Sequence, residues 1–163
     1  MRKKYLTTSP AQTKKLGEIL AKEVLKTKQK WALIFGLEGD LGGGKTTFLQ
    51  GFARGLGIKE KILSPTFMIL KRFKITKIKN QKLKIKNTNQ KFKNFYHIDC
   101  YRISKPEEIL ALGFKEIISN PKNIVAIEWS DQVRKIIPKN SLIIKFELVN
   151  KNKRKISFTP FRN

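Results

Sequence analysis

Residues 39–47, GDLGGGKTT, combine four glycines with a lysine and two hydroxyl side chains, a set suited to binding phosphate. The spacing matches the pattern G-x-x-x-x-G-K-[ST], whose backbone N–H groups and following helix N-terminus attract phosphate oxygens. In this pattern the lysine reaches the β- and γ-phosphates and the hydroxyl after it binds Mg²⁺. We therefore predict a nucleotide site formed by Gly39, Asp40, Leu41, Gly42, Gly43, Gly44, Lys45, Thr46 and Thr47.

Two carboxylates are candidates for the rest of the chemistry. A hydrolase built on such a loop also needs a carboxylate that helps to hold Mg²⁺ and a group that orients water. Two apolar segments end in acids, FYHID at Asp99 and IVAIE at Glu128. We expect one acid to hold the magnesium ion and the other to orient water or act as a general base. His97 is expected to touch substrate, to orient Asp99 or to be a hydrogen-bonded structural histidine.

The elements before and after the loop support this interpretation. Thr8-Ser9-Pro10 is a helix-start signal, and the apolar spacing behind it predicts a helix that ends near Lys28. The apolar run 31–37 predicts a strand buried on both faces of a sheet, leading directly into the loop. Residues 46–56 then predict a helix with one apolar side and Gly57 as its stop.

The second half of the chain predicts an α/β fold: a P-loop NTPase-type sheet flanked by helices. Pro106 opens a short helix. The remaining strands are predicted at 66–70, 95–103, 123–129, 142–149 and 155–158, the last two joined by the polar turn 150–152. We expect one domain over residues 1–163, because this length suits a single core.

Residues 71–94 are predicted to be a basic insertion between two strands. The piece 77–86 alternates Lys with aliphatic residues, which is compatible with a hairpin carrying one Lys face and equally with a solvated loop. The whole chain carries 36 Lys and Arg against 12 acids, a net charge of +24. Such a field favours polyanions such as RNA. A bias toward A/T-rich codons, which encode Lys, Asn and Ile, would produce the same charge without RNA binding.

Composition bounds the class of protein. The hydrophobic fraction of 40% is that of a globular chain. Cys100 is the one cysteine, so an internal disulfide is excluded. The basic N-terminus has no apolar run behind it, and no apolar run approaches the roughly 20 residues that span a bilayer. We expect a soluble, cytoplasmic protein with no membrane partner.

Four short motifs, taken together and in order, resemble the bacterial TsaE (YjeE) family. They are GDLG through KTT at 39–47, SPTF at 64–67, HIDCYR at 97–102 and IEW at 127–129. The resemblance covers most of the chain. It implies a small P-loop ATPase that binds ATP and Mg²⁺ and hydrolyses ATP slowly. It also implies a role in making threonylcarbamoyladenosine next to the tRNA anticodon, with a TsaD–TsaB complex as partner and tRNA reached through that complex.

The resemblance also implies residue roles. Thr46 and Glu128 correspond to the magnesium pair, and Asp99 to the catalytic carboxylate, with Lys45 at the phosphates. Thr66 resembles a switch residue near the γ-phosphate, and Trp129 occupies a matched position at the nucleotide. ATP hydrolysis in such proteins resets the partner complex between turnovers.

Three other functions are weighed against this one. A small-molecule kinase on a P-loop usually carries an Arg-bearing lid, whereas the insertion has Arg72 as its one arginine. A GTPase switch would carry Asn-Lys-x-Asp, and residues 150–153 read NKNK instead. A basic RNA-binding protein with a vestigial P-loop would bind RNA without turning over ATP.

Overall fold

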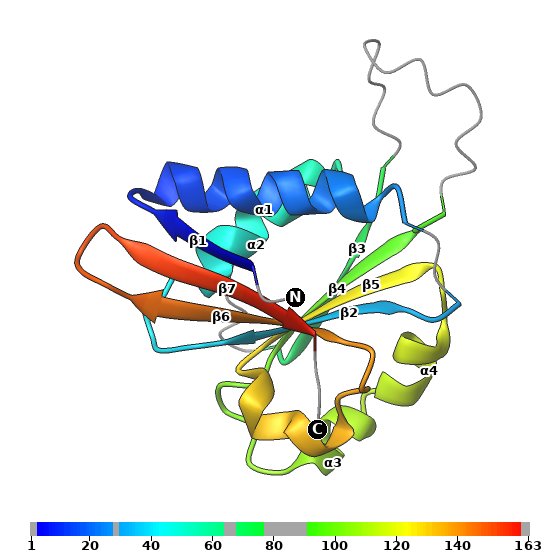
Figure 1. Cartoon of the computed structure of the whole chain (residues 1–163). Coiled ribbons are helices and arrows are strands. Elements are labelled where there is room, and N and C mark those ends of the chain that lie inside the picture. The colour runs from blue at the N-terminus through cyan, green and yellow to red at the C-terminus, as the bar shows by residue number, and fades with distance from the viewer. Residues whose placement is uncertain (1–2, 28–29, 64–67, 77–90, 161–163) are drawn as a thin grey trace.

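The apolar segments of the sequence assemble into one mixed sheet with helices on both faces (Figure 1). The computed structural model describes residues 3–27, 30–63, 68–76 and 91–160. Within these residues the sheet has seven strands in the order β1-β7-β6-β2-β5-β4-β3. They are β1 (Lys3–Thr7), β2 (Leu33–Glu38), β3 (Leu70–Lys74), β4 (Asn94–Asp99), β5 (Asn123–Glu128), β6 (Leu142–Leu148) and β7 (Arg154–Pro160).

The centre of the sheet is parallel and its two margins are antiparallel. β6, β2, β5 and β4 run parallel as neighbours, whereas β1 and β7 on one side and β3 on the other pair antiparallel. Parallel strands bring their carboxyl ends to one edge, where ligands bind in open α/β sheets. The ends of β2, β4 and β5 therefore meet at the edge that carries the glycine-rich loop.

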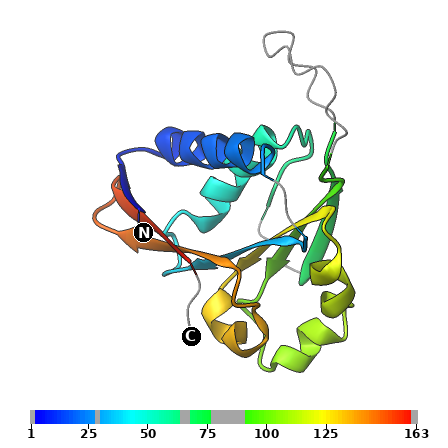
Figure 2. The same cartoon turned by 45° about the vertical axis from the view of Figure 1, so that its right-hand side comes forward.

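Two layers of helices cover the sheet (Figure 2). α1 (Pro10–Val24) and α2 (Lys45–Gly55) pack on one face, and α3 (Pro106–Leu110), α4 (Phe114–Ser119) and the 3₁₀ helix η1 (Ser130–Ile136) lie on the other. α1 begins as predicted: the Ser9 hydroxyl accepts a hydrogen bond from the Gln12 N–H at 3.2 Å, and Pro10 takes the first turn.

The core under α1 and α2 is aromatic. Phe52 of α2 packs edge-on against Phe35 of β2, with ring centroids 5.2 Å apart. Phe48 packs against Phe146 of β6 at 5.6 Å. Because these side chains are almost completely buried, they hold α2 over the middle of the sheet and so set where the loop before it lies.

The predicted fold class is correct, and several boundaries differ. β1 and α4 were not predicted, because β1 is largely exposed and α4 is a short helix. β4 ends at Asp99 rather than at 103, because the Asp99 carboxylate accepts the Tyr101 N–H and closes a turn. α1 ends at Val24 rather than near Lys28.

The predicted strand 66–70 begins only at Leu70 and continues to Lys74. The first and last parts of the predicted insertion 71–94 therefore belong to the sheet, with Phe73 and Phe92 in the core and the Ile75 N–H donating to the Lys93 carbonyl at 2.9 Å. The piece 77–86 lies outside the described residues.

Cys100 lies in the core between the sheet and the helices α3, α4 and η1. It is completely buried, and burial raises the pKa of its thiol to about 12. The thiol is therefore protonated at neutral pH and packs as a small apolar group. Separately, among the helices of the described residues none combines the length and the apolar character needed to cross a bilayer.

Candidate nucleotide site

The loop between β2 and α2 takes a shape that only glycine permits at its first residue. Gly39 has φ +129°, and a Cβ at this position would lie 2.1 Å from the Phe146 carbonyl oxygen of β6. A side chain is therefore excluded both by backbone conformation and by the neighbouring strand. The tight turn directs the loop over the carboxyl end of β2.

The start of α2 leaves its backbone donors available for an anion. Gly44 is the N-cap with φ 99°, and no side chain caps the helix. The first N–H groups of a helix have no partner within the helix, and the helix dipole adds partial positive charge there. α2 thus begins without a side-chain cap at the position where the sequence pattern predicts a phosphate.

Lys45 is buried at the centre of the loop. Its Nζ donates to the carbonyl oxygens of Gly39 and Asp40, the latter at 2.9 Å, and lies 3.9 Å from the ring centroid of Trp129. Burial lowers the pKa of Lys45, and the carboxylates of Glu128 and Asp99 oppose that shift. The ammonium group is thus surrounded by carbonyl oxygen acceptors and an aromatic face.

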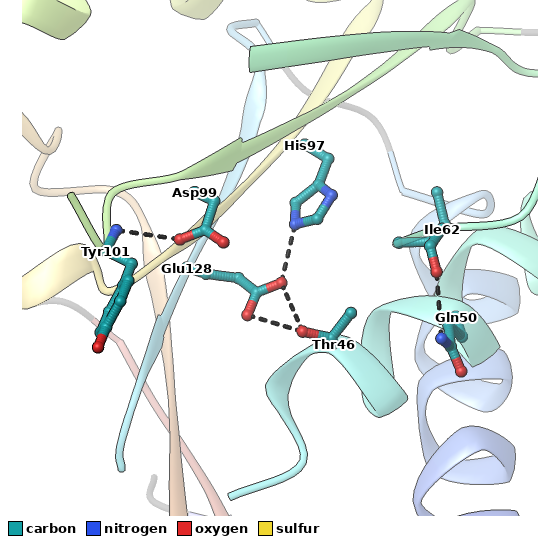
Figure 3. A network of polar contacts seen from close by, with 7 residues as sticks. All are labelled: Thr46, Gln50, Ile62, His97, Asp99, Tyr101 and Glu128. Carbon is teal, nitrogen blue, oxygen red and sulfur yellow. Dashed lines mark hydrogen bonds and ion pairs between the residues drawn. The ribbon is translucent and has the colours of Figure 1, made fainter. Parts of the chain in front are cut away.

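Thr46 and Glu128 meet across 82 residues of sequence (Figure 3). The Thr46 hydroxyl lies 3.1 Å from each carboxylate oxygen of Glu128. His97 Nε2 lies 2.8 Å from Glu128 Oε1 on the other side, and both side chains are almost fully buried. Glu128 is therefore held from two directions by β4 and α2.

Asp99 stands beside Glu128, because the two residues are register partners on the parallel strands β4 and β5. Register partners point to the same face of a sheet, here the face that carries α2. Asp99 is half-buried, and its Oδ1 accepts the Tyr101 N–H at 3.0 Å. The two acids thus stand side by side (Figure 3), with Glu128 buried and Asp99 partly exposed.

Trp129 has a strained backbone at the mouth of the site. Its φ of 57° makes it the one residue other than glycine with positive φ in the described chain. Such a conformation is costly for an aromatic residue and persists when surroundings hold it. Here the ring lies over the Lys45 ammonium and 5.1 Å from the Tyr101 ring.

These residues line a pocket of about 310 Å³ beside the loop. One wall is formed by Asp99, Tyr101, Glu128 and Trp129, and all of these except Tyr101 are site residues named from the sequence. The opposite wall is formed by three residues that were not predicted to belong to the site, namely Pro10, Thr13 and Arg154. No pattern in the sequence marks those three, since none belongs to a motif with the loop.

The other predicted site residues lie in the loop, at Thr66 and at His97. Of the loop, Leu41 through Thr47 line the pocket, and Gly39 and Asp40 contact Lys45 instead. Thr66 lies outside the described residues. His97 was considered as a partner of Asp99, and its ring contacts Glu128.

The donor set at Thr46 and Glu128 fits a magnesium ion. Mg²⁺ takes oxygen ligands and is commonly held by one or two carboxylates together with substrate phosphates. A half-buried hydroxyl and a buried carboxylate, 3.1 Å apart and next to the glycine-rich loop, match that description. Across residues 3–27, 30–63, 68–76 and 91–160, no group of three or more His, Cys, Asp or Glu gathers as in a protein-only metal cage.

Comparison with known proteins gives matches over most of the chain. A family model described as "Threonylcarbamoyl adenosine biosynthesis protein TsaE" matches residues 7–156. The tRNA threonylcarbamoyladenosine biosynthesis protein TsaE of Bacillus subtilis is 32% identical over 160 residues, covering 98% of this chain and 87% of that protein. The protein of the same name from Borreliella burgdorferi is 38% identical over 117 residues, covering 71% of this chain and 74% of that protein.

A solved structure shows the same architecture. The "Crystal structure of Bacillus subtilus YdiB" superposes with a TM-score of 0.68 and 27% sequence identity, covering 100% of this chain and 88% of that one. The seven-stranded sheet with helices on both faces is thus a P-loop NTPase-like fold in the residues that the structure describes.

Proposed function

Because this chain belongs to the TsaE family, we propose that it is a Mg²⁺-dependent ATPase that supports synthesis of threonylcarbamoyladenosine in tRNA. In this proposal it acts with a TsaD–TsaB-type complex, which transfers the threonylcarbamoyl group to the adenosine next to the anticodon. ATP hydrolysis resets that complex between turnovers. The tRNA is reached through the complex, and the activity belongs in the cytoplasm.

One observation carries the proposal: the phosphate loop and two acids from separate strands share a pocket. The uncapped start of α2 and Lys45 provide for the phosphates. Thr46 and Glu128 provide oxygen ligands for Mg²⁺, which neutralises charge on the phosphates when bound. In this proposal Asp99, which lies beside Glu128, orients or deprotonates the attacking water.

Lys45, Trp129 and Thr66 take supporting roles in this proposal. Lys45 stabilises the negative charge that develops on the transferred phosphoryl group. The Trp129 ring covers the Lys45 ammonium and limits access of water to it. Thr66 is proposed as a switch residue at the γ-phosphate on the family resemblance.

The decisive experiment measures modified nucleosides in tRNA. Cells are depleted of this protein, and threonylcarbamoyladenosine is quantified by mass spectrometry. We expect the nucleoside to be lost, and to be restored by the wild-type protein but not by Lys45→Ala. Lys115→Ala serves as the control, since Lys115 is exposed on α4 at the opposite face. An unchanged nucleoside level in depleted cells would contradict the proposed role.

Assays on the purified protein distinguish the proposed ATPase from the three alternative functions. ATP turnover is measured alone and with a TsaD–TsaB-type complex, and we expect stimulation by the complex. Phosphoryl transfer to added nucleosides would favour a small-molecule kinase. Preference for GTP over ATP in competition would favour a GTPase. Tight RNA binding that Lys45→Ala leaves unchanged, without any turnover, would favour an RNA-binding protein with a vestigial loop.

A further inference from the structure

The wall of the pocket opposite the two acids is formed by the start of α1 and the start of β7. Arg154, the first residue of β7, lies along the phosphate loop: its Nη2 donates to the Gly42 carbonyl at 3.3 Å. Its aliphatic stem passes close to Gly44, where an added Cβ would lie 3.8 Å from Arg154 Cγ and Cδ. The proposed phosphate chemistry uses none of these contacts.

The order of the strands places the two walls on opposite sides of the loop. β5 and β4, which end in the two acids, lie on one side of β2, and β6 and β7 lie on the other. Lys45, Thr46 and Glu128 would hold the terminal phosphates and Mg²⁺ near the acid wall. A nucleotide is a linear chain of phosphates joined to a nucleoside. Its nucleoside end must therefore leave the loop toward the wall that carries Arg154.

The Arg154 side chain is fixed in place by the turn that precedes it. Nη1 donates to the Lys151 carbonyl at 2.9 Å, while Nη2 reaches Gly42, so the guanidinium plane is held at both ends. A planar guanidinium stacks on aromatic rings, and its charge favours the face of the ring. Arg154 thus offers a flat, positively charged surface where a base would emerge.

The rest of this wall provides shape rather than hydrogen bonds. The Thr13 hydroxyl already pairs with the buried Thr7 hydroxyl at 2.8 Å, and Pro10 has no backbone N–H to donate. Both acids among the described lining residues, Asp99 and Glu128, stand on the opposite wall. A base at this wall would therefore be bound by stacking, not by a carboxylate that pairs with the N–H groups of guanine.

We propose that Arg154 binds the nucleoside end of the nucleotide, with its guanidinium stacked on the base. The inference rests on the proposed ATP binding and adds the residue that distinguishes a nucleotide from a bare phosphate chain. Arg154 bonds to Gly42 of the loop and to Lys151 of the β6–β7 turn, so it also links the loop to that turn.

The test compares ATP with inorganic tripolyphosphate, which has the phosphates but no nucleoside. Affinities for both, with Mg²⁺ present, are measured by calorimetry for wild type, Arg154→Ala, Arg154→Lys and Lys155→Ala. Lys155→Ala is the matched control, because it also removes one positive charge from β7, at the residue next to Arg154. The Lys155 side chain pairs with Glu147 at 2.8 Å.

We expect Arg154→Ala to weaken ATP binding by about 3- to 30-fold, the range of a stacked cation, and to leave tripolyphosphate binding unchanged. Arg154→Lys should also bind ATP more weakly than wild type, since an ammonium group is not planar and cannot stack on a base. Lys155→Ala should match wild type for both ligands. Retained tripolyphosphate binding by Arg154→Ala also shows that the loop is folded in that variant.

Three results would overturn the inference while leaving a phosphate site in place. They are an equal loss of both ligands in Arg154→Ala, full recovery by Arg154→Lys, and no loss of either ligand. A wild-type protein that binds neither ATP nor tripolyphosphate would instead contradict the proposed function itself, and this inference with it.

Discussion

Glu128 and Asp99 are neighbouring carboxylates whose surroundings differ. Glu128 is 2% exposed and is approached by the Thr46 hydroxyl and the His97 ring. Asp99 is half-buried and accepts a backbone N–H from the turn that follows it. A buried acid beside a hydroxyl suits a metal ligand, and a more accessible acid suits a group that meets water.

This difference predicts separable effects of two isosteric substitutions. Glu128→Gln should lower turnover and also raise the Mg²⁺ concentration needed for half-maximal rate. Asp99→Asn should lower turnover by about 10²- to 10⁴-fold, as for loss of a general base, with the Mg²⁺ requirement unchanged. Steady-state ATPase rates over a magnesium titration measure both, and thermal melts of each variant check folding.

Tyr101→Phe is the control for this prediction about single residues, because phenylalanine keeps the backbone N–H that bonds to Asp99. It should retain the wild-type magnesium dependence. Hydrolysis at the wild-type rate in both carboxylate variants would contradict the assignment of the two acids.

The pair α1 and α2 positions the phosphate loop through close backbone contact. A Cβ at Gly51 of α2 would lie 1.9 Å from the Lys14 carbonyl oxygen of α1, and one at Gly17 would lie 2.2 Å from the Phe48 carbonyl oxygen. The helices therefore touch where each has a glycine, and this contact brings Pro10 and Thr13 beside the start of α2.

Gly51→Ala should destabilise the protein although alanine is the better helix former by about 1 kcal/mol. The added methyl group clashes with backbone, so the helices must separate, at a cost of about 1–3 kcal/mol for overpacking. In a chain of this size that corresponds to a fall in Tm of several degrees. Differential scanning calorimetry measures the change.

Arg54→Ala, on the same helix, is the matched control. Arg54 makes an ion pair with Glu18 of α1 at 2.9 Å, but its side chain is 64% exposed. Exposed ion pairs contribute roughly 0–1 kcal/mol to the free energy of unfolding, so the Tm of this variant should stay close to that of wild type. A Gly51→Ala protein as stable as Arg54→Ala would show that α1 and α2 can move apart freely.

At the scale of the whole molecule, the segment 77–90 contributes to the net charge of +24. This segment holds five lysines and no acid. The chain leaves and re-enters the sheet at adjacent points, since the Ile75 N–H bonds to the Lys93 carbonyl at 2.9 Å. A short connection can therefore join these two points without disturbing the strands beside them.

Replacing residues 77–90 by a short Gly/Ser linker should leave the melting temperature and ATP turnover close to those of wild type. A large fall in melting temperature would show that the segment belongs to the core. RNA affinity over a salt titration separates the two interpretations of the charge. Each lost phosphate contact reduces the slope of log K against log salt by about 0.7 for single strands.

A full-length variant with Lys77, Lys79, Lys82, Lys84 and Lys86 changed to Gln is the control for chain length. If it keeps the wild-type salt slope, the lysines form a solvated face. If it loses slope to the same extent as the linker variant, they contact RNA.

Parts of the molecule that depend on local sequence could be predicted. The loop at 39–47, the helix start at Ser9-Pro10 and the buried strands 33–38 and 123–128 follow from turn residues, caps and apolar runs. β1 could not be predicted, because four of its five residues are exposed and its place in the sheet depends on pairing with β7, about 150 residues away. Strand pairing across the length of a chain has no local signal.

The sequence by itself determined the phosphate loop, because its glycines, lysine and helix start lie within nine consecutive residues. Their geometry follows from local backbone conformation. Only the tertiary structure decided that His97 contacts Glu128 rather than Asp99, and that Arg154 faces the loop from 112 residues beyond Gly42. Those contacts depend on strand order and register, which arise from burying the two faces of the sheet and not from any neighbouring residues.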